Sequence, residues 1–197
     1  MSDAPTLTAV LQARFPQHVL GTHAYRGQET VVLKREGWLK VARFLRDDPA
    51  MAFDFLMDLA CVDYLKFGRS QSSAPTLTTP SPLPYFMTPK PQAERWERVV
   101  SDDEFRFEVV CHLYSSLRNR RLRVKVPLTA ADPSMPSLTG LWKSADWFER
   151  EAWDMFGVTF TGHPNLRRIL MYESFQGHPL RKDYPIRKRQ PLIGPVN

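Results

Sequence analysis

Cysteine is scarce in this sequence, and its two cysteines are far apart. Cys61 and Cys111 lie 50 residues from each other in a chain of 197 residues. This arrangement predicts neither a disulfide framework nor a cysteine metal site, and it suits a reducing cytoplasm best. An iron–sulfur cluster usually takes four ligands, mostly cysteine thiolates, so this chain cannot hold such a cluster alone. We therefore expect no metal-binding residues here.

Motifs that bind nucleotides or perform catalysis are also missing. Residues 157–164, GVTFTGHP, have the glycine spacing of a phosphate-binding loop, but His163 and Pro164 replace the required lysine and hydroxyl residue. The sequence contains no Gly-x-Gly-x-x-Gly, His-Glu-x-x-His or Gly-x-Ser-x-Gly pattern. We therefore expect no cofactor-binding residue and no catalytic residue on this chain.

Long apolar runs are absent as well. None approaches the ~20 residues that a helix needs to cross a bilayer. Residues 1–16, MSDAPTLTAVLQARFP, contain an early acid and no basic segment before an apolar run, which predicts neither a secretory signal nor a transit peptide. Any membrane contact is therefore expected to be indirect or peripheral.

The periodicity of the apolar residues indicates a domain that contains both helices and strands. Helical spacing predicts helices over 6–15 and 38–46, and short alternating or apolar runs predict strands. The predicted strands cover 19–25, 29–34, 59–65, 105–114 and 122–126, with a hairpin turn at 26–28. This order predicts an α+β fold in which helices flank a largely antiparallel or mixed β-sheet.

The best-marked helix is predicted over 145–156. Ser144 can cap its first turn, Asp146 complements the positive end of the helix dipole, and Gly157 stands just past its end. Five aromatic residues lie in or beside this segment: Trp142, Trp147, Phe148, Trp153 and Phe156. Their density predicts that at least one charge of the helix meets a packed surface.

The charged side chains of this helix permit two interpretations. Glu149, Glu151 and Asp154 form a carboxylate cluster that could transfer protons. Asp146, Arg150 and Asp154 recur at i, i+4 spacing, however, so the arginine can pair with an acid on either side. We favour a salt-bridged helix face, and Arg150 with its acids could equally anchor a subunit contact.

Proline marks an insertion within the domain. Residues 69–92 contain six prolines together with many Ser and Thr. This composition denies the backbone regular pairing and predicts a surface insertion or a mobile loop. A regulatory segment is the alternative.

The C-terminal region, 163–197, differs in composition from the rest. It has five prolines, seven basic residues and two acidic residues, and it thus carries +5 of the chain's net charge of +6. Proline excludes a long helix, yet the many apolar side chains are unsuited to water. We therefore predict a domain over 1–162 and an extended tail over 163–197, which lies on a surface that belongs partly to another polypeptide. Nucleic-acid binding is the alternative, but no recognition helix or strand platform supports such a partner.

Two histidines of the tail occur in similar contexts. His163 and His178 each lie in a Gly-His-Pro tripeptide, 15 residues apart. A metal site or an acid–base site is one interpretation. We favour the other, in which a turn histidine donates and accepts local hydrogen bonds.

Residues 142–185 contain three motifs that together resemble a known family. The motifs are Glu149-Arg150-Glu151-Ala-Trp-Asp154-Met155-Phe156-Gly157, then Phe160-Thr-Gly162-His163-Pro164-Asn165-Leu166-Arg167-Arg168-Ile169-Leu170, and finally Gly177-His178-Pro179-Leu180-Arg181-Lys182-Asp183-Tyr184-Pro185. This stretch resembles the C subunit of the respiratory NADH-quinone oxidoreductase (complex I), the 30 kDa subunit family. Asn165 and Ile186 are mild departures, because the family often has Asp and Leu there.

The resemblance implies a cofactor-free subunit in the peripheral arm, at the cytoplasmic face of a bacterial inner membrane. FMN and iron–sulfur clusters would lie in partner subunits, and the complex would transfer electrons from NADH to quinone and translocate protons. The tail would lie along the large quinone-module polypeptide (the D subunit), close to subunits B and I. Residues expected at subunit interfaces or in assembly are Glu149, Arg150, Glu151, Asp154, Gly157, His163, Arg167, Arg168, His178, Arg181, Lys182, Asp183 and Tyr184.

Overall fold

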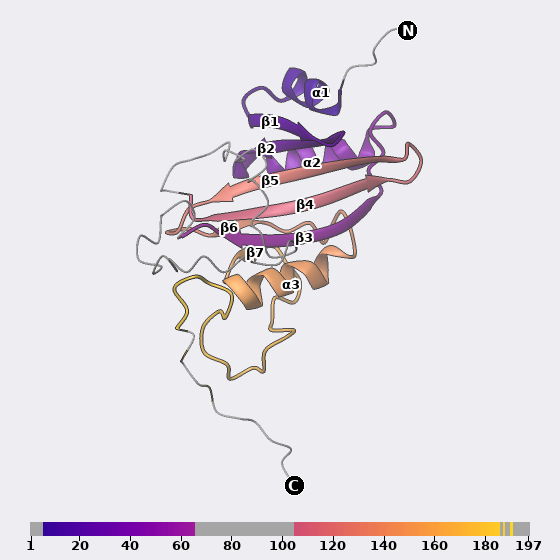
Figure 1. Cartoon of the computed structure of the whole chain (residues 1–197). Coiled ribbons are helices and arrows are strands. Elements are labelled where there is room, and N and C mark those ends of the chain that lie inside the picture. The colour runs from indigo at the N-terminus through magenta and orange to yellow at the C-terminus, as the bar shows by residue number, and fades with distance from the viewer. Residues whose placement is uncertain (1–5, 66–104, 186, 188–189, 191–197) are drawn as a thin grey trace, which may run out of the picture.

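A computed structural model describes residues 6–65, 105–185, 187 and 190. Within these residues, a five-stranded sheet is accompanied by three α-helices and a small two-stranded sheet (Figure 1). This arrangement confirms the predicted α+β fold. The predicted insertion at 69–92 lies outside the described residues, as do residues 191–197 of the predicted tail.

The elements agree with most of the predicted segments. The helices are α1 (Leu7–Arg14), α2 (Trp38–Asp47) and α3 (Ala145–Phe156), and a short 3-10 helix, η1 (Arg35–Gly37), precedes α2. The strands are β1 (Val19–Tyr25), β2 (Gln28–Leu33), β3 (Phe55–Asp63), β4 (Phe107–Ser115), β5 (Arg120–Leu128), β6 (Ser134–Pro136) and β7 (Thr159–Thr161). Two differences from the predictions concern β3, which begins at Phe55 rather than at 59, and the pair β6–β7, which was not predicted.

The larger sheet is mixed because one of its junctions is parallel. Its strand order is β1-β2-β5-β4-β3. β1 and β2 form an antiparallel hairpin, and β4 is antiparallel to both β3 and β5. β2 and β5 pair in parallel, with Val31 opposite Val124.

One face of this sheet carries the hydrophobic core. The register places Val109 opposite Val126 and Cys111 opposite Val124, and all four are buried. Because side chains alternate along a strand, the residues between them point to the other face. The buried side chains of α1, α2 and α3 join the first set in one core cluster, so all three helices contribute to the core on this face.

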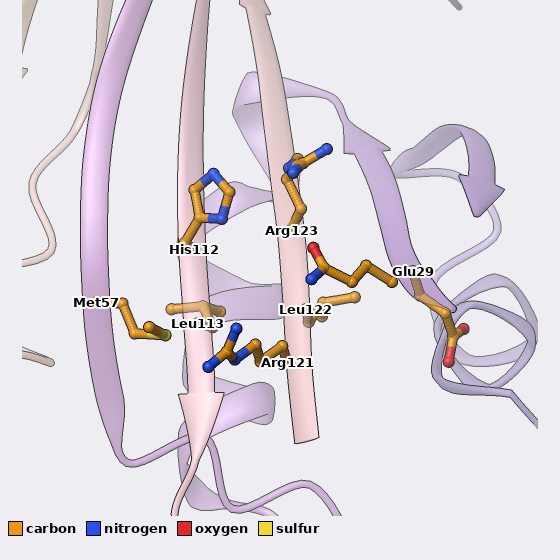
Figure 2. Close-up of a pocket in the computed structure, with 8 residues that line it drawn as sticks. Glu29, Met57, His112, Leu113, Arg121, Leu122 and Arg123 are labelled. Atoms are coloured by element: carbon orange, nitrogen blue, oxygen red, sulfur yellow. The ribbon is translucent and has the colours of Figure 1, made fainter. Parts of the chain in front are cut away.

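The opposite face of the sheet is more polar. There the register places His112 opposite Arg123 and Tyr114 opposite Arg121. Figure 2 shows His112 and Arg123 side by side on adjacent strands. They belong to a groove lined by Gln28, Glu29, Met57, His112, Leu113, Arg121, Leu122 and Arg123.

The structure confirms α3 over the predicted range but corrects its predicted N-cap. Gly157 ends the helix in the left-handed region, with φ 74°, and its N–H donates to the carbonyl of Trp153. Ser144 has helical backbone angles and does not cap the first turn. Its hydroxyl donates instead to the carbonyl of Leu56, 3.1 Å away on β3. Tertiary contact with the sheet thus replaces the local cap.

The segment from 163 to 185 loops around the C-terminal end of α3 (Figure 1). No helix or strand is assigned within these residues. Leu166 packs on the core cluster, whereas Leu170 and Leu180 are exposed. The surface on which this part of the tail lies therefore belongs at least in part to its own chain.

Candidate functional site

The acidic residues of α3 lie in three different environments. Glu149 and Asp154 are fully buried, Asp146 is partly exposed and Glu151 is exposed. A buried charged group is costly unless it is paired and hydrogen-bonded. The donors that reach Glu149 and Asp154 therefore determine how this site is built.

Asp154 accepts hydrogen bonds from the segment that follows β7. Its Oδ2 accepts from the N–H groups of Ile169, Leu170 and Met171 at 3.1, 2.9 and 2.9 Å. Its Oδ1 lies 2.5 Å from Nη1 of Arg168. Burial alone would raise the pKa of Asp154, but the donors, led by the Met171 N–H and Arg168, lower it below its ordinary value. Asp154 is therefore ionised, and it holds this segment against α3.

Arg168, which binds Asp154, also binds the part of the chain near residues 175–177. Its Nη2 donates to the carbonyls of Phe175 and Gly177, at 2.7 and 3.0 Å. Its guanidinium carbon lies 5.5 Å from the ring centroid of Phe175 and 5.6 Å from that of Trp153. A planar guanidinium can donate hydrogen bonds and contact aromatic rings at the same time, because its donors lie in the plane and its faces stay free. Asp154 and Arg168 together fix the loop between 168 and 177.

Residues 178–180 supply partners for carbonyls at the end of α3. The last carbonyls of any helix lack partners within it. His178 Nδ1 lies 3.0 Å from the carbonyl oxygen of Asp154, and the Leu180 N–H donates to the carbonyl of Met155 at 3.1 Å. Burial lowers the pKa of His178. The neutral ring can therefore donate from Nδ1 and keep its place against the helix end.

Arg181 and Gly157 complete this end of the helix. Arg181 Nε donates to the carbonyl of Phe156 at 2.5 Å. A Cβ at position 157 would overlap the side chains of both Arg181 and His178, and the positive φ of Gly157 also disfavours other residues. Glycine is therefore needed here for its small size as well as for its backbone conformation.

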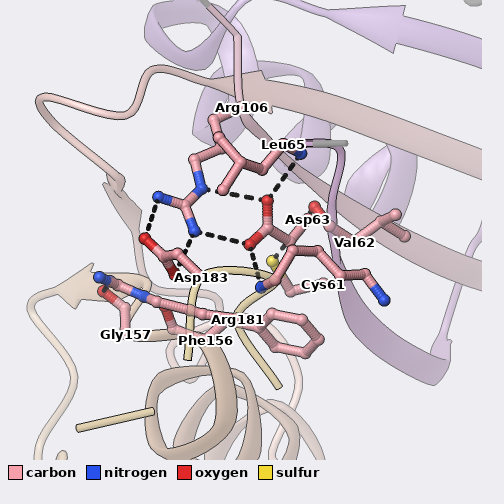
Figure 3. A network of polar contacts seen from close by, with 10 residues as sticks. Cys61, Val62, Asp63, Leu65, Arg106, Phe156, Gly157, Arg181 and Asp183 are labelled. Atoms are coloured by element: carbon pink, nitrogen blue, oxygen red, sulfur yellow. Dashed lines mark hydrogen bonds and ion pairs between the residues drawn. The ribbon is translucent and has the colours of Figure 1, made fainter. Parts of the chain in front are cut away.

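A second network joins the same segment to the end of the sheet. Arg106 lies between two carboxylates, Asp63 of β3 and Asp183 of the tail (Figure 3). Its Nε and Nη2 donate to Asp63 at 3.0 and 2.8 Å, and its Nη1 and Nη2 donate to Asp183 at 2.9 and 2.7 Å. The side chain of Asp63 is fully buried, whereas that of Asp183 is 50% exposed. One guanidinium thus binds a buried and a half-exposed carboxylate.

Asp63 also binds backbone on both sides of this network. It accepts from the N–H of Leu65 at 3.0 Å and from the N–H of Lys182 at 2.9 Å. Burial would raise the pKa of Asp63, but the bonds from Arg106 and these N–H groups lower it. Asp63 is therefore an ionised group that connects β3 to residue 182.

Glu149 has fewer donors than Asp154. It accepts one hydrogen bond from the Ser137 hydroxyl, at 2.7 Å, and one from the Leu138 N–H, at 2.6 Å. Burial raises the pKa of Glu149 to about 7, and the nearby Asp146 adds to this effect. At neutral pH this carboxyl group is therefore divided between its protonated and ionised forms.

The side chain of His163 lies beside that of Glu149 and is fully buried. Its Nδ1 accepts from the N–H of Asn165 at 3.0 Å, so a neutral ring carries its proton on Nε2. Nε2 lies 3.2 Å from the carbonyl oxygen of Asp146, 3.1 Å from Asp146 Oδ1 and 4.0 Å from Glu149 Oε2. The bond to Asn165 has the local turn character that was predicted for His163. Each of the two histidines also lies within hydrogen-bond distance of a carbonyl of α3, that of Asp146 for His163 and that of Asp154 for His178.

The predicted ladder of Asp146, Arg150 and Asp154 is wrong. Arg150 donates instead to the carbonyls of Arg167 and Arg168, at 3.2 and 3.1 Å. Asp154 points into the protein, where four donors from the tail are available, and Asp146 faces His163. The i, i+4 rule describes an exposed helix face, and this face is covered by the chain itself.

The side chains of the remaining predicted site residues are peripheral to these networks. Arg167, Lys182 and Glu151 are exposed. The ring of Tyr184 stacks on Phe175, with 6.1 Å between ring centroids and an interplanar angle of 20°. These side chains are available at the surface or pack on the loop that Arg168 fixes.

Two residues of the site, Asp63 and Arg106, were not predicted. Asp63 follows an apolar strand, and Arg106 stands between Phe105 and Phe107, where alternation alone assigns it to a strand. Their meeting depends on the pairing of β3 with β4, in which Asp63 lies opposite Phe107. No local spacing in the sequence indicates this contact.

Two features of the described residues bear on cofactors and membranes. Within 6–65 and 105–185, no group of three or more His, Cys, Asp or Glu side chains is arranged to hold a metal ion. In the same part of the chain, no helix combines the length and the apolar character needed to span a bilayer.

Comparisons with known proteins agree with one another. Residues 31–190 match the family model of the respiratory-chain NADH dehydrogenase 30 Kd subunit. The NADH-quinone oxidoreductase C subunit of Roseiflexus castenholzii is 43% identical over 184 residues, which cover 93% of this chain and 85% of the relative. The corresponding protein of Citrifermentans bemidjiense is 42% identical over 196 residues, or 98% of both chains.

Solved structures show the same likeness. A trypsin-resistant fragment of Nqo5 has a TM-score of 0.51 and 29% sequence identity, covering 81% of this chain and 97% of the fragment. A chain of the membrane-bound sulfane sulfur reductase, an archaeal respiratory membrane complex, shares the fold with a TM-score of 0.62 and 16% identity, covering 91% of this chain and 84% of that one. Since the family model spans most of the sequence and relatives match nearly all of it, this chain belongs to the family of 30 kDa polypeptides, the C subunits, of respiratory NADH-quinone oxidoreductase.

Proposed function

We propose that this chain is a non-catalytic, cofactor-free subunit of the quinone module in the peripheral arm of complex I. In this role it scaffolds the subunits that bind the clusters and quinone, while FMN and iron–sulfur clusters reside in its partners. The complex would transfer electrons from NADH to quinone and translocate protons, at the cytoplasmic face of a bacterial inner membrane. Membrane contact would be indirect, through the complex.

The observation that carries this proposal is that the charged residues of the site bind groups of their own chain. Asp154 and Asp63 are buried, ionised and saturated with donors from their own chain. Arg106 and Arg168 complete these bonds. Catalytic acids and bases need access to a reacting group, whereas these residues hold residues 163–183 in a defined shape against α3 and the sheet.

The shaped segment and the neighbouring α3 present apolar side chains outward. Trp147 of α3 is 63% exposed, and Leu170 and Leu180 of the segment are 57% and 50% exposed. Large exposed apolar residues on a segment that is otherwise held in place are typical of protein contacts. We propose that they, with the rest of the tail to 197, contact the large D subunit, and that subunits B and I lie nearby.

Replacement of the exposed leucines tests this role. Leu170→Asp/Leu180→Asp keeps every backbone bond described above but places charge on the proposed interface, so the amount of complex that co-purifies with the tagged chain should fall severalfold. Leu117→Asp is the matched control, because Leu117 is 75% exposed between β4 and β5, away from α3. Turnover per assembled complex should stay unchanged in both. Normal assembly with lost turnover would contradict a scaffolding role.

A further inference from the structure

Within residues 6–65 and 105–185, the groove on the polar face of the sheet contains two arginines without an ion-pair partner. Arg121 and Arg123 belong to β5 and point away from the core. Among the described residues, no carboxylate lies within ion-pair distance of either guanidinium. Arg121 contacts the ring of Tyr114, with 5.9 Å from its guanidinium carbon to the centroid. No direct ion pair from the part of the chain that the structure describes therefore neutralises the positive charge at this place.

Two of the acids near this groove have other partners, whereas a third, Asp58, is exposed on β3 opposite His112. Glu108 pairs with Lys125, 3.0 Å away. Glu29 lines the groove, but its carboxylate accepts from the N–H groups of Leu7 and Thr8, at 3.1 and 2.8 Å, and so caps α1. Neither acid is free to turn toward the arginines without breaking these bonds.

Two histidines respond to the same positive charge. Burial lowers the pKa of His112, and Arg123 lowers it further. The pKa of His23 is lowered by burial first and then by Lys125 and Arg123. Both rings are therefore held toward their neutral forms, and the net positive charge of the face comes from the basic residues of β5.

The surroundings of the arginines indicate which kind of anionic partner the groove can bind. A membrane surface is bound by clusters of about four to eight basic residues, and nucleic acid by broader basic surfaces. This groove has two uncompensated arginines with Glu29 and Glu108 close by, and its edge includes Met57, which is 36% exposed. The charge is local and flanked by apolar surface, which suits a short peptide segment and disfavours an extended anionic surface.

We propose that the polar face of the sheet, at Arg121, Arg123 and Met57, docks an acidic segment of another protein subunit. Arg121 and Arg123 are two residues apart on one strand and therefore about 7 Å apart along it. Carboxylates on alternate residues of an extended segment have the same spacing, and each guanidinium can bind one of them in a bidentate manner. Figure 2 shows Met57 on the strand next to that of His112 and Leu113, where apolar side chains of the same segment would contact it. The inference rests on the proposed function in that the partner is a subunit of the same complex.

A photo-crosslinking amino acid in place of Met57, in the full-length tagged chain within the purified complex, tests the proposal. We expect a crosslink to an acidic peptide of another subunit, identified by mass spectrometry. Arg121→Glu/Arg123→Glu should reduce this crosslink about tenfold or more, because like charges would then face each other. Arg121→Gln/Arg123→Gln should reduce it less. Arg43→Glu, at an exposed arginine on α2, is the matched control and should leave the crosslink unchanged.

Several outcomes would overturn the inference. They are a crosslink to residues 66–104 of the same chain, a crosslink to lipid, the absence of any crosslink, and a crosslink that the charge reversal leaves intact. The charge-reversed chain must show the thermal unfolding midpoint of the wild type; if it does not, the glutamine pair decides. A chain that fails to co-purify with the complex overturns the proposed function as well. Co-purification without the expected crosslink overturns this inference alone.

Discussion

Glu149 and Asp154 lie five residues apart on α3, and both are inaccessible to solvent. The pKa of Glu149 is nevertheless raised to about 7, whereas that of Asp154 is lowered. The two sites differ in their donors. Asp154 binds three N–H groups and a guanidinium, while Glu149 binds one N–H and one hydroxyl. Burial disfavours the charged form at both sites, and only Asp154 has enough donors to reverse that effect.

The largest effect on stability is expected from removing the charge of Asp154, which has more hydrogen-bond donors than Glu149. Asp154→Asn leaves Arg168, which is 11% exposed, without its anion, and it presents an amide N–H₂ to donors. Loss of one partner of a buried ion pair costs about 3–5 kcal/mol. Urea unfolding at pH 7 should show a decrease of this size. Glu151→Gln, at an exposed position on the same helix, should change stability by less than about 0.5 kcal/mol. If the two substitutions changed stability equally, the claim that a buried acid of α3 contributes more to stability than an exposed one would be wrong.

A smaller, pH-dependent effect is expected at Glu149. Its pKa is 4.5 ordinarily and about 7 in the folded chain. A raised folded pKa means that the contribution of Glu149 to stability is fully present below pH 4.5 and is lost as the pH rises to about 7, at a total of about 3 kcal/mol. Glu149→Gln keeps an acceptor for Leu138 and should remove this dependence. The difference in unfolding free energy between wild type and variant, measured from pH 5 to 8, isolates Glu149 from His23, His112 and His178. A constant difference would show that the pKa of Glu149 is not raised.

The smallest effect is expected at the exposed end of the Arg106 network. Asp183 is 50% exposed, and half-exposed ion pairs contribute little because water competes for both partners. Asp183→Asn should therefore lower stability by less than about 1 kcal/mol in thermal or urea unfolding. Asp63→Asn, at the buried end of the same guanidinium, is the comparison and should cost more. If Asp183→Asn lowered stability more than Asp63→Asn, the account in which the buried carboxylate contributes more than the exposed one would be wrong.

Local features of the fold were predictable from the sequence. α3 has aromatic and charged residues at helical spacing and a glycine at its end, and these determine its range and its left-handed terminus. The central strands β4 and β5 were predicted because apolar residues alternate along part of each strand, and these alternate positions are buried. β6 and β7 were missed because each has three residues, and their parallel pairing joins residues about 25 positions apart.

The site itself was predicted as a set of residues but not as a set of contacts. The resemblance indicated Asp154, Arg168, His178 and Arg181, and the structure brings these together at the end of α3. Helical spacing wrongly paired Arg150 with acids of its own helix, since the donors for Asp154 come from residues 14 to 17 positions further along the chain. Such partners depend on how the tail folds back, which periodicity does not encode.

The central claim, that this chain contributes structure and not proton chemistry, is tested most directly at Glu149. With a pKa of about 7, Glu149 is suited to carry a proton at neutral pH. The measurement is NADH:quinone turnover per assembled complex, with proton translocation, in membranes that contain Glu149→Gln. We predict wild-type turnover and translocation for each complex formed. Normal assembly with abolished turnover or translocation would contradict the claim and identify Glu149 as part of a proton path.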